Sequence, residues 1–282
     1  MNEPLNPDVA EGFIRLRGHL SYDGTQFSGW GSQIGQRTVQ GHLEECFAQI
    51  LRSERLAITC AGRTDAGVHA SDQVFHIDVP LAGLPTMPDL MYKVNAILDF
   101  DVVMTRCEIA PDGFDARFSA LSRTYVYLVN DGLRNPLTRR HVYNHGWALD
   151  VERMRESSRP LLGLHDFTSF CKQKDFGTAI RELKVFDWTR QEDGVIRIDV
   201  TADAFCYSMV RGLVGCVMDV GANRRPIEWP AEYLAMRKRE PSAFVAPARG
   251  LTLVGVEYPA DSELRTRIAQ TKRNRLREFT DI

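Results

Sequence analysis

Apolar side chains change their spacing several times along this chain, and each change predicts a change of secondary structure. Residues 14 to 22 alternate, with apolar residues at most even positions and polar residues at the odd ones, which predicts a half-buried strand. Residues 39 to 51 follow the spacing of one helix face, and Thr38 is a suitable N-cap. Two further strands, 56–60 and 75–79, are expected on either side of a glycine-rich loop.

Later elements continue this alternation of the two periods. We expect helices at 89–98, 151–162, 204–220 and 230–239, and strands at 102–109, 123–129, 181–190 and 195–201. Pro230 is expected at the first position of the last helix. Helices that recur between strands predict an α+β protein whose sheets carry helices on one face. The similar order of elements in the two halves predicts a duplicated unit, with a boundary between residues 115 and 150.

The composition is that of an ordinary globular protein. With 282 residues, 44% of them hydrophobic, the chain can bury the core of one large domain or of two fused smaller ones. The first twelve residues are polar and acidic, so we expect no secretory signal, and no apolar stretch is long enough to span a bilayer. The six cysteines form no CxxC pair, which argues against a zinc site and a disulfide framework and favours a reducing cytoplasm.

The charge balance gives no global sign of a polyanionic partner. Lysine and arginine number 35 against 37 acidic residues, so a nucleic-acid surface must be a local patch. One candidate is the segment 264–277, LRTRIAQTKRNRLR, which holds six basic residues and no acidic one. It is either a solvated terminal helix or an RNA-contacting extension.

The loop GRTDAGVHA, residues 62–70, is the strongest candidate for chemistry. It places two glycines, Arg63 and Asp65 between two apolar strands, where a rigid scaffold often presents a reactive group. Asp65 is either a catalytic carboxylate or the cap of the following turn, and the loop taken alone does not decide between them.

The apolar segment 204–220 raises a second question, because Arg211 lies within it. A guanidinium in a buried helix needs a carboxylate or other acceptors. If the partner is Asp65, the pair keeps that carboxylate ionised, as a nucleophile or base requires. Asp203 and Asp219 are the alternative partners of a purely structural ion pair.

Two further segments combine aromatic residues with cations or glycines. Residues 116–130 interleave Arg117, Arg123, Tyr125 and Tyr127, a mixture that suits a stacked base beside a phosphate but also an ordinary sheet surface with two core tyrosines. Residues 22–30, YDGTQFSGW, could be only a hairpin turn. The seven histidines show no metal-ligand spacing, and the common nucleotide-cofactor patterns are absent from the sequence.

Taken together, these segments resemble the TruA-type family of tRNA pseudouridine synthases. YDGTQFSGW and TVQGHLE (38–44) resemble its amino-terminal signature, GRTDAGVHA its catalytic loop, and FDARFSALSRTYVY (114–127) its tyrosine strand. LLGLHDFTSF (161–170), MVRGLVG (209–215) and ARGLTLVGVEYP (248–259) complete the set. The six ordered segments run through nearly the whole chain, which makes the resemblance specific.

The resemblance assigns roles to single residues. It implies that Asp65 is the essential aspartate, that Arg63 contacts the RNA near the displaced base, and that Tyr125 lies on the target uracil. It also implies that Arg211 pairs with the aspartate and that Leu251 forms an apolar wall of the uracil pocket.

The chain departs from the family pattern at a few positions that concern local RNA contacts. Gly31 stands where glutamine is usual, and Cys206 and Ser208 stand where leucine and histidine are common.

The implied fold consists of two ferredoxin-like halves, 13–115 and 116–260, whose sheets join around a central cleft, followed by a basic tail, 261–282. The implied reaction is the isomerisation of uridine to pseudouridine at positions 38, 39 and 40 of tRNA, by a cytoplasmic homodimer that flips the base and needs no cofactor or metal.

Three other functions are kept as alternatives. One is an RNA-binding module without catalysis. Another is a nucleoside or glycoside hydrolase, for which Asp72 is the only second carboxylate offered near the loop. The third is a synthase that modifies another RNA.

Overall fold

The computed structural model describes residues 9–172, 178–241 and 243–271, and the chain divides into two compact units. Unit 1 comprises residues 1–121 and 255–282, and unit 2 comprises residues 122–254. The halves expected from the sequence were 13–115 and 116–260. The end of the last strand and the tail thus group with unit 1. Both units mix helices and strands, as the predicted α+β class requires.

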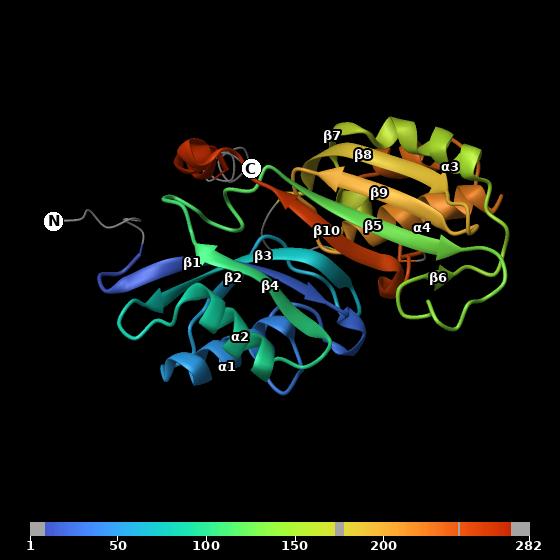
Figure 1. Ribbon diagram of the computed structural model, residues 1–282. Coiled ribbons are helices and arrows are strands. Elements are labelled where there is room, and N and C mark those ends of the chain that lie inside the picture. Colours follow the sequence, from blue (N-terminus) through green and yellow to red (C-terminus); the bar gives the residue numbers. More distant parts are fainter. Residues whose placement is uncertain (1–8, 173–177, 242, 272–282) are drawn as a thin grey trace. The chain divides into compact units, whose positions relative to one another are not determined.

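The amino-terminal part of unit 1 is a four-stranded antiparallel sheet with the helices α1 and α2. Its elements are β1 (Phe13–Tyr22), α1 (Val39–Leu51), β2 (Ile58–Cys60), β3 (His69–Pro80), α2 (Met87–Ile97) and β4 (Val102–Ile109). The strand order is β4-β1-β3, with β2 beside β3. The helices α1 and α2 lie together on one face of this sheet (Figure 1).

Local sequence explains why these elements form. Leu16, Leu20 and Tyr22 are buried while the odd positions from 15 to 21 are half-buried, so the predicted alternation is confirmed. The Thr38 side chain accepts a hydrogen bond from the backbone of Gly41 and thereby caps α1 as expected.

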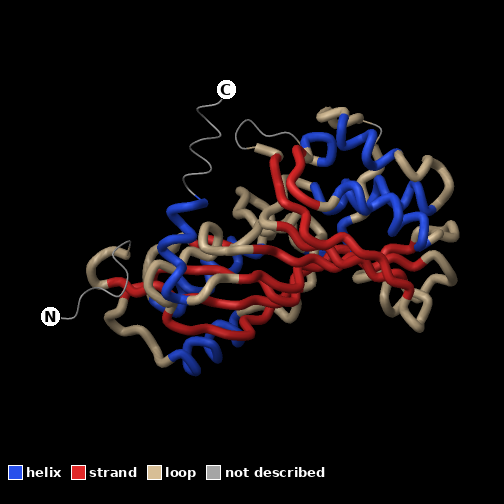
Figure 2. Tube along the Cα trace, turned by 90° about the horizontal axis from the view of Figure 1, so that it is seen from above, coloured by secondary structure: helices blue, strands red, loops and turns tan. Residues whose placement is uncertain are grey.

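Unit 2 repeats this plan with additional elements. It contains β5 (Ser122–Asn130), β6 (Tyr143–Asn144), α3 (Val151–Ser158), β7 (Gly163–Asp166), β8 (Ile180–Arg190), β9 (Ile196–Ala202), α4 (Met209–Gly221), α5 (Trp229–Ala235) and the start of β10 (Leu251–Glu257). Its helices gather on one side of its strands (Figure 2). Short 3-10 turns occupy 24–26, 159–161, 168–170, 248–250 and 261–263.

The strand orders of the two units correspond. Unit 2 runs β10-β5-β9-β8-β7, and its first four strands have the relation that β4-β1-β3-β2 have in unit 1. One helix follows the first strand in each unit and another precedes the last, so the order of elements repeats. The strands β6, β7 and β10 were not among those expected from the sequence.

Three predicted helices are shorter than expected. The helix expected at 151–162 ends at Ser158 and is followed by the 3-10 turn 159–161. The helix expected at 204–220 begins only at Met209, because Ser208 has a left-handed backbone with φ of 63° that cannot continue into a helix on its amino-terminal side. The helix expected at 230–239 spans Trp229–Ala235, with Pro230 at its second position. None of the helices in the described ranges is both long and apolar enough to cross a membrane.

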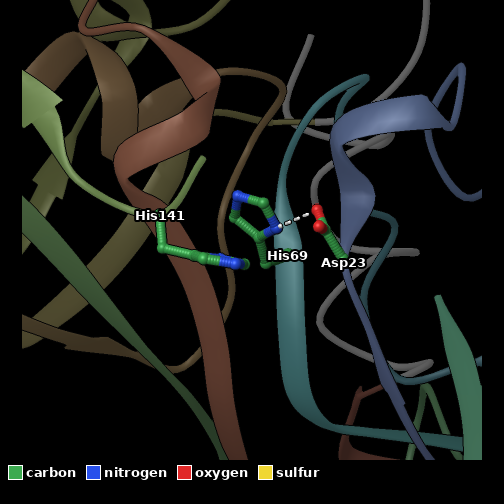
Figure 3. A group of neighbouring side chains, drawn as sticks. All are labelled: Asp23, His69 and His141. Atoms are coloured by element: carbon green, nitrogen blue, oxygen red, sulfur yellow. Dashed lines mark ion pairs between the residues drawn. The ribbon is translucent and has the colours of Figure 1, made fainter. Parts of the chain in front are cut away.

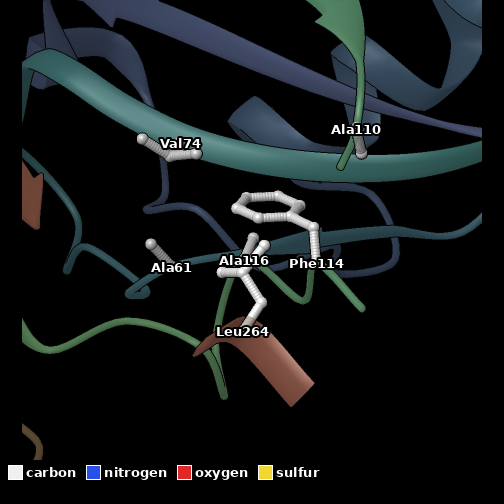
Figure 4. Close-up of a cluster of buried hydrophobic side chains, with 6 residues drawn as sticks. All are labelled: Ala61, Val74, Ala110, Phe114, Ala116 and Leu264. Atoms are coloured by element: carbon white, nitrogen blue, oxygen red, sulfur yellow. The ribbon is translucent and has the colours of Figure 1, made fainter. Parts of the chain in front are cut away.

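The basic tail starts as part of the core of unit 1. Leu264 is 1% exposed and packs in a buried cluster with Ala61, Val74, Ala110, Phe114 and Ala116 (Figure 4). Residues 264–271 are helical, and Arg265 forms an ion pair of 2.7 Å with Asp112. Leu264 therefore has a packing role, and Arg265 forms an ion pair at the surface of unit 1. Arg267, the second basic residue in the described part of the tail, donates to the Ala120 carbonyl oxygen at 3.3 Å. The other four basic residues, at 272–277, lie outside the described residues.

This packing predicts a measurable cost for shortening Leu264. Leu264→Ala should lower the free energy of unfolding by about 2–4 kcal/mol, because it empties a buried site lined by small residues and Phe114. Denaturant unfolding followed by circular dichroism measures this change. Thr266→Ala, an exposed position in the same helix, serves as the control and should change stability by less than about 0.5 kcal/mol. Equal stability of the two variants would show that the tail does not anchor in the core.

Candidate active site

The loop between β2 and β3 presents Asp65 on a tight, ordered turn. The Val68 N–H donates to the Asp65 carbonyl oxygen at 3.1 Å, and Gly67 has a φ of +77°, which favours glycine. The hydrogen bond that closes the turn therefore uses the backbone of Asp65 and not its carboxylate. Asp65 is half-buried and Arg63 is exposed, whereas Thr64 between them is buried. Both sequence-predicted residues of this loop lie in unit 1.

The glycine-rich segment 22–30 packs backbone to backbone against this loop. A Cβ atom at Gly24 would overlap the carbonyl group of Val68, and one at Gly29 would lie 2.9 Å from the Thr64 carbonyl oxygen. Gly29 also has a φ of +91°. Larger residues would force the two segments apart, so the glycines of YDGTQFSGW have a steric reason. That segment is more than a hairpin turn.

Backbone hydrogen bonds join the two segments. The Trp30 N–H donates to the Thr64 carbonyl oxygen at 3.0 Å, and the Gly67 N–H donates to the Phe27 carbonyl oxygen at 3.3 Å. These bonds flank Asp65 on both sides in the sequence. They restrain the backbone that carries the carboxylate.

Side chains from β1 and β3 also support the loop. The Tyr22 hydroxyl group lies 2.8 Å from the Thr64 hydroxyl group, and the Gln73 amide nitrogen donates to the Gly62 carbonyl oxygen at 2.7 Å. Tyr22 and Gln73 are both buried. Neither residue was expected from the sequence to support the loop, although Tyr22 ends the alternating pattern of the first strand.

His69 links the end of the loop to the turn after β1. Its Nδ1 lies 3.1 Å from the Asp23 carboxylate, and the Gly24 N–H donates to the same nitrogen at 3.0 Å (Figure 3). A neutral ring accepts from Gly24, whereas a protonated ring pairs with Asp23, so either state holds this histidine to residues 23–24. We assign His69 a structural role in the loop.

Arg63 lies beside the position at which the chain departs from the family pattern. A Cβ atom at Gly31 would be 3.7 Å from the Arg63 guanidinium. The absence of a side chain at Gly31 therefore leaves space along the exposed Arg63. A larger residue at this position would contact the guanidinium directly.

Unit 2 holds the other three predicted site residues. Tyr125 lies in β5, is 6% exposed and meets the Phe205 ring edge-on, with centroids 5.3 Å apart. Leu251 is the first residue of β10 and is buried.

Arg211 is in the first turn of α4 and is half-buried, not in the middle of a buried helix as predicted. The late start of the helix at Met209 explains this difference. Asp203 and Asp219, the alternative partners considered from the sequence, are engaged elsewhere: Asp203 accepts from the Glu182 backbone, and Asp219 pairs with Arg224 at 3.5 Å.

The segment 246–251 connects these three residues within unit 2. The Arg211 Nε donates to the Ala246 carbonyl oxygen at 2.7 Å, and the Ala246 N–H donates back to the Arg211 carbonyl oxygen at 3.0 Å. The Tyr127 hydroxyl group donates to the Pro247 carbonyl oxygen at 3.0 Å, one turn before Leu251. A short piece of chain thus fixes Arg211 next to the strand that carries Tyr125.

The cations and tyrosines of segment 116–130 have different environments in the structure. Arg123 is buried and donates to the Asp203 carbonyl oxygen at 2.7 Å, and Tyr127 is fully buried. Arg123 and Tyr127 therefore have structural roles, which is one of the two interpretations that the sequence left open. Arg117 lies over the Phe118 ring at 5.5 Å.

A disulfide joins Cys171 and Cys206 in unit 2, which corrects the expectation drawn from the scattered cysteines. The two residues are 35 positions apart in the sequence, so spacing gave no sign of the pair. The Lys172 N–H donates to the Tyr207 carbonyl oxygen at 2.9 Å and brings the two segments together.

Comparisons with known proteins identify the family. A family model described as tRNA pseudouridine synthase matches residues 158–259. The tRNA pseudouridine synthase A of Frankia casuarinae is 46% identical over 274 residues, which cover 95% of this chain and 98% of that protein. The enzymes of the same name from Streptomyces griseus and Mycobacterium leprae are 46% and 41% identical, and each alignment covers 94% of this chain and at least 95% of the relative. Because the similarity extends over nearly the full length of both chains, this protein belongs to the tRNA pseudouridine synthase A family.

Proposed function

We propose that this isomerase converts uridine to pseudouridine at positions 38, 39 and 40 of tRNA, with Asp65 as the catalytic carboxylate. The placement of Asp65 carries the proposal: it is a half-buried carboxylate on a turn that backbone hydrogen bonds restrain on both sides. A rigid, partly exposed carboxylate suits a group that must meet one sugar carbon of a bound nucleotide.

The reaction is an internal rearrangement. The bond between N1 of uracil and C1′ of ribose breaks, the uracil turns while it stays bound, and a bond between C5 and C1′ forms as C5 loses its proton and N1 gains one. Atoms and electrons balance without an oxidant or a transferred group. The carboxylate of Asp65 either attacks the substrate or removes a sugar proton.

We assign the residues of unit 2 to the bound uracil. Tyr125 supplies the ring that holds the detached base, Leu251 an apolar wall, and Arg211 the partner of the Asp65 carboxylate. The Arg211 Nε donates to the Ala246 carbonyl oxygen and so holds the guanidinium within unit 2, whereas its pairing with Asp65 rests on the family resemblance. A double-mutant cycle of Asp65→Asn and Arg211→Gln on turnover measures the pairing; additive losses would argue against it.

Arg63 is proposed to fill the space left by the flipped base, since it is exposed and two residues from Asp65. The family resemblance further implies a cytoplasmic homodimer. Light scattering of the purified protein with and without tRNA tests the dimer.

A basic patch in unit 2 provides a surface for tRNA phosphates. The loop 131–147 exposes Arg134, Arg139, Arg140 and Trp147. Its one acidic residue, Asp131, is neutralised by Arg190 at 2.8 Å. Because the whole chain carries a net charge of −2, such a local excess of cations is what binding to a polyanion requires.

Substitution of the carboxylate tests the catalytic assignment. Asp65→Asn should lower the single-turnover rate of tritium release from tRNA labelled at uracil C5 by about a thousandfold or more, with tRNA affinity nearly unchanged. Asp72→Asn is the matched control, since Asp72 is a nearby carboxylate in β3 held 2.7 Å from His19, and should retain the rate within a few-fold. Modified positions are mapped by carbodiimide treatment and primer extension.

The same experiment separates the alternatives. Release of free uracil that needs both Asp65 and Asp72 would indicate a hydrolase. Binding of tRNA without tritium release by the unchanged protein would indicate an RNA-binding relative. Modification at sites outside positions 38 to 40 would overturn the proposed specificity and leave the reaction intact.

Removal of charge from the basic patch tests the binding surface. Arg139→Ala combined with Arg140→Ala should weaken tRNA binding and lower the slope of log affinity against log salt concentration by about 2, if each arginine meets one phosphate. Lys184→Ala, an exposed cation in β8, should leave the slope unchanged. An unaltered slope in the double variant would exclude this loop from the tRNA surface.

A further inference from the structure

Tyr22 contacts the Asp65 loop from β1 and has no assigned part in the reaction. It is the last residue of β1, only 4% of its surface is exposed, and its hydroxyl oxygen lies 2.8 Å from the Thr64 hydroxyl oxygen and 3.4 Å from the Gln73 amide nitrogen. Thr64 directly precedes Asp65. A buried phenol therefore contacts the side chain next to the proposed catalytic carboxylate.

The orientation of the Gln73 amide determines in which contact the Tyr22 hydroxyl group accepts a hydrogen bond and in which it can donate one. The amide group of Gln73 faces the Gly62 carbonyl oxygen at 2.7 Å, and a carbonyl oxygen only accepts, so this end of the amide must be the NH2 group. The same nitrogen contacts the Tyr22 oxygen. Tyr22 thus accepts from Gln73 and has its own hydrogen available for Thr64.

Gln73 holds this orientation although its other end is not satisfied. It is fully buried, and its Oε1 has no hydrogen-bond partner among the described residues. Leaving a buried acceptor unpaired is unfavourable, so the two contacts made by the nitrogen determine the conformation. Burial also raises the pKa of Tyr22 above its usual range, which keeps the phenol a neutral donor at working pH.

These contacts fix the chain immediately before Asp65. Gln73 holds the Gly62 carbonyl group, Tyr22 holds the Thr64 side chain, and the Trp30 N–H holds the Thr64 carbonyl group. The direction of the Asp65 side chain follows from the backbone of its neighbour. A displacement of about 1 Å at a reacting group can lower a rate about a hundredfold.

We propose that Tyr22 is a positioning residue for pseudouridine formation: its hydroxyl group, oriented by Gln73, fixes Thr64 and thereby the direction of the Asp65 carboxylate. The inference rests on the proposed role of Asp65. The contrasting interpretation is that Tyr22 only stabilises the fold, since its ring also packs near Phe27 and Trp30, with centroids 6.4 and 6.3 Å away.

Tyr22→Phe removes the hydroxyl group and keeps the ring. It should lower the single-turnover rate at saturating enzyme at least about tenfold, with the tRNA dissociation constant within twofold of the unchanged protein and the Tm lowered by no more than about 4 °C. Tyr258→Phe is the matched control, because Tyr258 is a half-buried tyrosine of unit 1 whose hydroxyl group donates to the Ala116 carbonyl oxygen at 2.7 Å. It should lower the Tm similarly and keep the rate.

Variants of Thr64 provide an independent measurement. Thr64→Ser retains the hydroxyl group and should keep most of the rate, whereas Thr64→Val should lose as much as Tyr22→Phe. The combined Tyr22→Phe and Thr64→Val protein should be no slower than the slower single variant, because both act through one hydrogen bond. If Tyr22→Phe does not fold, the contrast between serine and valine at position 64 decides the question.

Two results would overturn the inference. One is a Tyr22→Phe rate within twofold of that of Tyr258→Phe, and the other is equal rates for the serine and valine variants of Thr64. The Asp65→Asn protein, measured in parallel, separates the two levels of the argument. If it remains active, the proposed function fails; if it is inactive while Tyr22→Phe is normal, only the role of Tyr22 fails.

Discussion

The backbones of residues 22–30 and of the loop 62–68 touch each other directly, and only glycine fits at two of the contact points. Gly24 meets the Val68 carbonyl group, and Gly29 adopts a positive φ against Thr64. Without a side chain between them, the two segments can form backbone hydrogen bonds on both sides of Asp65. A turn that would otherwise be mobile becomes part of the rigid scaffold. The chemistry proposed for Asp65 depends on this contact, since a carboxylate on a loose loop would not meet one carbon atom reproducibly.

The two units show how the same order of strands serves different purposes. In unit 1 the connection from β2 to β3 carries Asp65 and is packed against a second segment. In unit 2 the corresponding connection, from β8 to β9, is a short hairpin in which the Gln191 N–H donates to the Val195 carbonyl oxygen at 2.8 Å. Residues 191–193 of this hairpin are exposed. The role proposed for Asp65 therefore depends on the residues placed on this turn and not on the repeated plan itself.

Local sequence patterns predicted which helices and strands form, whereas tertiary contacts determined where some of them begin. The strand at β1 and the capped helix α1 were predictable because alternation and an N-cap are properties of neighbouring residues. The start of α4 was not, since the left-handed backbone at Ser208 is set where the segment also joins Cys171 through Cys206. The predicted position of Arg211, in the middle of the helix, was wrong because the helix begins only at Met209.

The residues proposed for the site came from the sequence and stay a prediction, whereas the contacts that hold the loop became visible only in the structure. Asp65 was a candidate because it lies in a glycine-rich loop between two apolar strands, and the family resemblance gave it the catalytic role. Tyr22 and Gln73 could not be predicted as supports of the loop, because a residue in an alternating strand gives no sign of whether its polar atom meets a loop far away in the sequence. Buried polar contacts of this kind depend on the register of β1 against β3.

The strand β5 shows why structural and functional interpretations of one segment need not exclude each other. Arg123, Tyr125 and Tyr127 occupy alternate positions and so share one face of the strand. Arg123 and Tyr127 are core residues, but Tyr127 binds Pro247 and thereby holds the segment whose Ala246 fixes Arg211. Tyr125, placed between these two anchors, meets Phe205 edge-on and cannot shift along the strand independently. The tyrosine proposed to hold uracil is therefore positioned by buried neighbours in unit 2.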